Sequence, residues 1–147
     1  MVGRGLRLAG LTLPLMLGLN SPALAVKDFM LHCNVKNCTD INSNPVACDR
    51  NINSEGNTLN ILFMMETQIT ALRGIGLLPD WTNLKFVRSA DGAYEWAAEP
   101  RNDQQMKLFM RRDFTEGDVR FYHCIGDNCV SKPHLTIAFA RCQRPSN

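Results

Sequence analysis

The alternation of apolar and polar residues along the chain is the pattern of β-strands that bury one face. It is clearest in the second half, where turn-forming residues separate short stretches of this kind. Asp91-Gly92 predicts a tight two-residue hairpin between the first two of these stretches. We expect strands over residues 84–89, 93–97, 105–111, 119–124 and 134–142.

The first half begins with a short apolar stretch. Residues 28–33 place Phe29 and Leu31 on one face of an extended chain, so they predict the first strand. Residues 34–57 contain seven asparagines and Pro45 without an apolar period. Because asparagine and proline favour turns, we expect a long Asn-rich loop after this strand.

Residues 58–73 allow two interpretations. Leu59, Ile61 and Phe63 alternate as in a strand, but the apolar positions also fit a single helix of about 15 residues. We favour two strands, 58–65 and 67–73, because the pattern after them is β throughout. About eight strands joined by short turns then predict an all-β, mainly antiparallel domain, either a small meander barrel or a two-sheet sandwich.

Residues 1–25 have the composition of a secretory signal peptide. Arg4 and Arg7 precede an apolar run over residues 8–19, and Ala23-Leu24-Ala25 matches a small-x-small cleavage pattern. The run is short for a transmembrane span, and no later stretch is apolar over the roughly 18 residues that a span needs. We therefore expect export, to the periplasm or beyond, with residues 26–147 as one mature domain and no transmembrane span.

The charge of the mature part argues against nucleic acid as a partner. The signal peptide holds two of the 16 basic residues and none of the 14 acidic ones, so the mature chain is close to neutral. Nucleic-acid binding requires concentrated Lys and Arg to neutralise phosphates.

Six cysteines in an exported chain indicate three disulfides, because the compartment is oxidising. Four of them lie in two copies of a His-Cys-x₃-Asn-Cys motif, which begin at His32 and His123. Pairing within short loops would give Cys38–Cys48 and Cys124–Cys129 and leave Cys33–Cys142 to join the first and last strands. The rival pairing joins the two motifs through Cys33 and Cys124.

Two metal hypotheses arise from the sequence. The His-Cys copies suggest a soft-metal site, but adjacent residues of a strand face opposite sides and the cysteine spacing is wide for zinc. The Asn-rich loop twice contains D-x-N-x-N, which is how a calcium loop begins, although the glycine and glutamate that should follow are absent in both copies. The weak candidate ligands are Asp40, Asn42, Asn44, Asp49, Asn51, Asn53 and Glu55.

No catalytic residue is expected. The three histidines lie outside any nucleophile or zinc-hydrolase motif, and the carboxylates are mostly at turns. No cofactor is implied either. Trp81, Tyr94 and Trp96 are candidate binding residues because aromatic side chains dominate interfaces, although such residues often only cover a core.

These observations favour an exported, non-catalytic binding or inhibitor-type protein of the cell envelope, with a protein or small molecule as partner. The expected architecture is similar to that of small periplasmic lysozyme inhibitors, which are disulfide-linked β-barrels of comparable size, but no motif places the chain among them. The alternatives are a carrier of a small ligand or metal, with methionines such as Met64, Met65, Met106 and Met110 as a soft lining, or an enzyme of unrecognised type. The sequence specifies neither the partner nor the oligomeric state.

Overall fold

The computed structural model describes residues 27–48, 58–65, 67–73 and 82–146, and every regular element in these ranges is a β-strand. The strands are β1 (Phe29–Asp40), β2 (Pro45–Val46), β3 (Thr58–Met64), β4 (Ile69–Arg73), β5 (Thr82–Ala90), β6 (Ala93–Ala97), β7 (Gln104–Arg111), β8 (Gly117–Ile125), β9 (Asn128–Cys129) and β10 (Leu135–Gln143).

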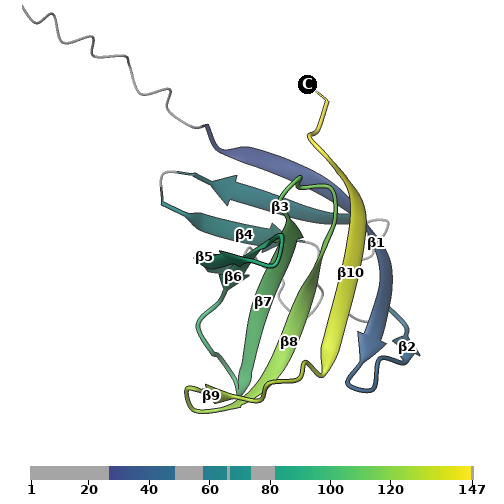
Figure 1. Ribbon diagram of the computed structural model, residues 1–147, viewed down its shortest axis with the longest axis vertical. Helices are drawn as coiled ribbons and strands as arrows, with labels where there is room; N and C mark the ends of the chain where they lie inside the picture. Colours follow the sequence, from purple (N-terminus) through teal and green to yellow (C-terminus); the bar gives the residue numbers. More distant parts are fainter. Residues whose placement is uncertain (1–26, 49–57, 66, 74–81, 147) are drawn as a thin grey trace, which may run out of the picture.

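Eight of these strands close into a barrel (Figure 1). Their order is β1-β3-β4-β5-β6-β7-β8-β10, all neighbours are antiparallel, and β10 pairs with both β8 and β1. The two-residue strands β2 and β9 extend this sheet locally, beside β1 and β8. The all-β antiparallel fold expected from the sequence is therefore confirmed, and of the two expected forms it is the barrel.

The first strand is longer than the sequence indicates. Residues 34–40 were expected in a loop, but they continue β1 and pair with β10 from Asn34↔Ala140 to Asp40↔Leu135. Two register shifts in this ladder, between His32 and Asn34 and between Val35 and Asn37, interrupt the alternation of side chains. The apolar period is lost there although the backbone remains in the sheet. Residues 49–57 of the expected loop lie outside the described ranges.

Residues 58–73 form strands and not a helix. β3 and β4 pair from Asn60↔Arg73 to Met64↔Ile69, and residues 65, 67 and 68 between them are in turn conformation. Leu59, Ile61 and Phe63 point into the barrel, which is the alternating interpretation of the sequence.

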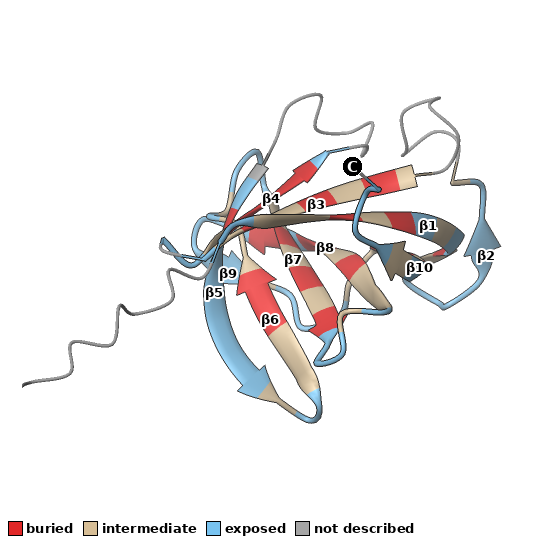
Figure 2. Cartoon of the chain, turned by 90° about the horizontal axis from the view of Figure 1, so that it is seen from above, coloured by how far each residue is buried: buried red, intermediate tan, exposed pale blue. Residues whose placement is uncertain are grey.

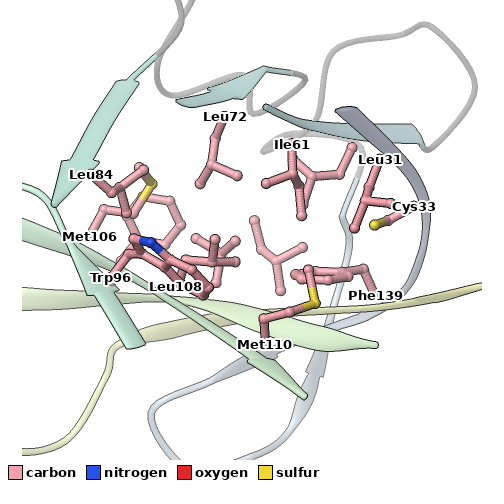
Figure 3. Packing of buried hydrophobic residues seen from close by; sticks show 14 of the residues in the cluster. Leu31, Cys33, Ile61, Leu72, Leu84, Trp96, Met106, Leu108, Met110 and Phe139 are labelled. Carbon is pink, nitrogen blue, oxygen red and sulfur yellow. The ribbon is translucent and has the colours of Figure 1, made fainter. Parts of the chain in front are cut away.

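The interior of the barrel is filled with side chains. Figure 3 shows Leu72, Ile61 and Leu31 facing Leu108, Met110 and Phe139 across it. Met106 and Met110 belong to this packed core. They therefore contribute to stability by burial of apolar surface and do not border an open lumen.

The described chain contains three disulfides, Cys33–Cys142, Cys38–Cys48 and Cys124–Cys129, and no free cysteine. These are the pairs that local pairing predicts, and the rival Cys33–Cys124 bridge is not the one formed. The first joins β1 to β10, whose Cα atoms at the bridge are 4.0 Å apart. Three such bonds indicate an oxidising, non-cytoplasmic compartment.

The β5–β6 hairpin extends beyond the barrel wall. β4 pairs with β5 only from Leu72↔Thr82 to Ile69↔Lys85, and the Phe86 N–H then reaches the Gln68 carbonyl at 3.2 Å. Within the described ranges, the rest of β5 pairs with β6 alone. Figure 2 shows this hairpin standing out from the barrel, with β5 exposed along most of its length.

Candidate functional site

An apolar groove of about 320 Å³ opens at the end of the barrel that carries the β3–β4 turn, the β5–β6 hairpin and the β7–β8 turn. This volume lies at the lower end of the range of ligand pockets. We call it the aromatic groove, and its lining residues are Phe63, Met64, Met65, Gln68, Ile69, Thr70, Phe86, Tyr94, Trp96 and Phe114.

Ring contacts connect the walls of the groove. Trp96 lies 5.3 Å from Phe63, 5.6 Å from Phe86 and 5.9 Å from Tyr94 between ring centroids. Phe114, from the β7–β8 turn, lies 5.5 Å from Tyr94 and 5.2 Å from Phe63. Such edge-to-face and tilted pairs stabilise by about 0.5–1.5 kcal/mol each beyond area burial. These contacts between aromatic rings therefore fix the walls of the groove relative to one another.

Exposure differs between the floor and the rim of the groove. Trp96 is 6% exposed and packs on the core, whereas Phe86 and Met65 are 38% and 39% exposed. Large apolar side chains at a concave surface mark binding sites more often than single exposed residues elsewhere do. The floor is therefore fixed, and the rim offers apolar area to a ligand.

A second cleft, of about 400 Å³, lies on the outer surface of β5–β8. We call it the charged cleft, because Arg88, Glu95, Arg111, Asp118 and Arg120 are among its lining residues. Each of these charges has an opposite partner within 4 Å in the described chain. These five charges are therefore already engaged in ion pairs.

Glu95 is the best-buried charge of this cleft, at 5% exposure. Arg88 Nε lies 2.7 Å from one of its carboxylate oxygens and Lys107 Nζ lies 3.3 Å from the other. Burial alone would raise the pKa of Glu95, but the hydrogen bonds and charges of Arg88 and Lys107 outweigh it and hold the pKa below its ordinary value. An ionised, doubly paired carboxylate is suited to structural stabilisation and not to proton transfer.

Some of the binding candidates from the sequence line the aromatic groove and others do not. Tyr94 and Trp96 both line the aromatic groove. Trp81 lies outside the described ranges. Met64 and Met65 line the groove as well, whereas Met106 and Met110 are core residues.

Asp40, the first candidate calcium ligand, is engaged by its own loop. One carboxylate oxygen accepts hydrogen bonds from the backbone N–H groups of Asn42, at 2.8 Å, and Asn44, at 2.9 Å. The Asn44 hydrogen bond is the main reason that the pKa of Asp40 lies below its ordinary value. This is an Asx-type turn. Asp49, Asn51, Asn53 and Glu55 lie outside the described ranges, and within those ranges no group of three or more His, Cys, Asp or Glu side chains could hold a metal ion.

His123 and His134 stack at the end of the barrel opposite the groove. Their ring centroids are 4.0 Å apart and their planes differ by 20°. Burial, and then the charge of His123, lower the pKa of His134 below its ordinary value. His134 is therefore kept neutral near neutral pH.

Sequence reasoning did not identify Phe63, Phe86 or Phe114 as site residues. Each looks like an ordinary core or strand position, and they meet only because the β3–β4 turn, the hairpin and the β7–β8 turn converge at one end of the barrel. The register that brings them together is set by pairings distant in sequence, so no local signal could have shown the cluster.

Comparison with protein families, with curated proteins and with solved structures finds no match for this chain. Among the described residues there is also no helix with the length and apolar character of a membrane span.

Proposed function

We propose that the protein is an exported, non-catalytic binding protein of the cell envelope, whose ligand places an apolar group in the aromatic groove. The observation that carries this proposal is the groove itself, which is apolar, is lined by aromatic rings in mutual contact, and has exposed side chains at its rim. Pockets of this kind, lined mainly by apolar and aromatic side chains, are typical of ligand sites.

The chemistry of the lining supports binding over catalysis. Of the ten lining residues only Tyr94 carries an ionisable side chain, so the groove lacks an acid–base pair. In the charged cleft the carboxylates of Glu95 and Asp118 are paired with arginine or lysine.

The groove can be tested with a neutral apolar probe. Trp81→Phe leaves Trp96 as the sole tryptophan, and we expect decan-1-ol to change its emission saturably. Phe86→Ala removes rim area and should weaken binding about tenfold. Val87→Ala is the matched control, because Val87 is 51% exposed on the same strand but does not line the groove. Equal effects of both substitutions, or no saturable change, would contradict the proposal.

An inhibitor-type interaction with a protein is a second candidate, favoured by the projecting hairpin. Val87 and Phe86 are exposed on β5, beyond its pairing with β4. An unpaired strand edge with apolar side chains can dock a partner. In a pull-down from the native envelope fraction, Val87→Asp should abolish capture of a specific protein, and Val130→Asp at the opposite end should not. If Val87→Asp does not affect capture, the hairpin is not the surface that binds the partner.

Export has its own test. Residues 1–25 lie outside the described ranges, and their composition predicts cleavage after Ala25. N-terminal sequencing of the exported protein should begin at Val26. Mature protein that retains Arg4 and Arg7 would contradict this part of the proposal.

A further inference from the structure

A guanidinium lies next to lining residues at the hairpin end of the aromatic groove. Arg112 is an exposed residue of the turn between β7 and β8, two residues before the lining residue Phe114. Its backbone N–H donates to the Gly92 carbonyl at 3.2 Å, and its Nη2 donates to Ser89 Oγ at 3.2 Å. Ser89 is paired with Tyr94, a lining residue. Arg112 thus contacts the hairpin beside the lining residue Tyr94 and is near the lining residue Phe114 in sequence, but it is not itself a lining residue.

Two neighbouring arginines, one on β5 and one on β7, are neutralised, and Arg112 is not. Arg88 pairs with Glu95, and Arg111 pairs with Asp113 and Glu116. Among the described residues the side chain of Arg112 has a neutral hydroxyl as partner and no carboxylate within 4.0 Å. An exposed guanidinium with donors to spare beside an apolar groove is complementary to a ligand with an anionic head and an apolar body.

We propose that the aromatic groove binds a free fatty acid, with its alkyl chain along the groove and its carboxylate at Arg112 and Ser89. This inference rests on the proposed function, because it names the ligand of the same groove. Arg112 can donate two N–H groups to a carboxylate, and the Ser89 hydroxyl can supply a third donor.

The lining suits a flexible chain. Met64 and Met65 at the β3–β4 turn are unbranched thioethers that adapt to an alkyl chain, and Phe86 and Trp96 supply flat apolar walls. The volume of about 320 Å³ accommodates one chain. The packed core closes the groove from below, so the chain lies at the mouth of the barrel and not inside it.

The test compares three probes that share a ten-carbon chain: decanoate, decan-1-ol and decyltrimethylammonium, each below its aggregation limit. With Trp96 as the sole tryptophan in the Trp81→Phe background, we expect decanoate to bind about tenfold more tightly than decan-1-ol, and the cation most weakly. Arg112→Gln should lower the affinity for decanoate to that for decan-1-ol. Arg101→Gln is the matched control, since Arg101 is an exposed arginine in the β6–β7 connection at the opposite end.

The outcomes separate the two proposals. If decan-1-ol binds as tightly as decanoate, or if Arg112→Gln and Arg101→Gln have the same effect, the carboxylate assignment is wrong while the groove remains a binding site. If none of the three probes binds saturably, the groove function itself is overturned. Because Arg112 is exposed, its substitution leaves the folded barrel intact, and thermal unfolding of Arg112→Gln checks this directly.

Discussion

Gly117 shows how tightly the backbone is packed where β8 begins. A Cβ at this position would collide with the Phe109 carbonyl and lie 2.8 Å from the ring of Phe139. Since Gly117 pairs with Met110 on β7 and with Phe139 on β10, neither neighbour can move without disturbing the barrel wall. Only glycine fits there.

We expect Gly117→Ala to lower the free energy of unfolding by about 1–3 kcal/mol, the cost of overpacking a core site. Gly126→Ala is the comparison, because a Cβ there meets open space and only the positive φ of 60° opposes it. Urea denaturation should give the larger loss for Gly117→Ala. Equal losses would mean that β8 can shift away from β7.

His134 makes stability depend on pH. Its pKa in the folded state lies below the ordinary 6.5, so at mildly acidic pH the unfolded chain binds more protons than the folded one. The contribution of neutral His134 to stability is therefore fully present above about pH 6.5 and is lost as the pH falls below this value toward the lower pKa of the folded state. His134→Gln should reduce the difference in melting temperature between about pH 8 and about pH 5. An unchanged difference would assign the pH dependence to other groups.

At the scale of single elements, the sequence predicts the strands well where side chains alternate and poorly where bulges intervene. β3, β7 and β10 follow their apolar period, and Asp91-Gly92 forms the expected turn with both φ angles positive, at 51° and 75°. The prediction for β1 is wrong after Cys33, because two register shifts interrupt the apolar period there. Pairing with β10 nevertheless keeps the backbone extended.

The aromatic groove could be predicted only in part for a related reason. Tyr94 and Trp96 stand out because aromatic residues on a hairpin are candidates in any sequence. Phe86 and Phe114 join them through the projection of β5 beyond β4 and through the β7–β8 turn, which depend on the lengths of neighbouring strands. The role proposed for Arg112 likewise depends on the placement of Ser89 across the turn.

On the outer face of β5–β7, Arg88 and Lys107 both form ion pairs with one carboxylate, that of Glu95. Glu95→Gln keeps the size of the side chain but removes the charge that both Arg88 and Lys107 contact. Because hydrogen bonds to a charged group contribute about 1.5–3 kcal/mol, we expect a loss of roughly 1–3 kcal/mol in chemical denaturation. Asp118→Asn in a more exposed pair should cost less. A larger loss for Asp118→Asn would reverse this assignment.

For the molecule as a whole, the disulfides should differ in their contributions. Cys33–Cys142 spans 109 residues and Cys124–Cys129 spans five. On the chain-entropy account, loss of the first costs about 4–5 kcal/mol and loss of the second about 2 kcal/mol. Paired Cys→Ala variants, compared by urea denaturation under oxidising conditions, should follow this order. The opposite order would show that local packing around Cys124 outweighs loop entropy.

The Cys33–Cys142 bridge also determines how the protein carries mechanical load. β1 and β10 lie side by side and pair from His32↔Gln143 to Asp40↔Leu135 (Figure 1). Tension applied to the two ends of the chain passes from Cys33 to Cys142 through a covalent bond, so the strands between them carry none of it. Under such a pull only residues before Cys33 and after Cys142 can extend. The barrel and its groove would keep their shape while the protein is tethered at one end and pulled at the other.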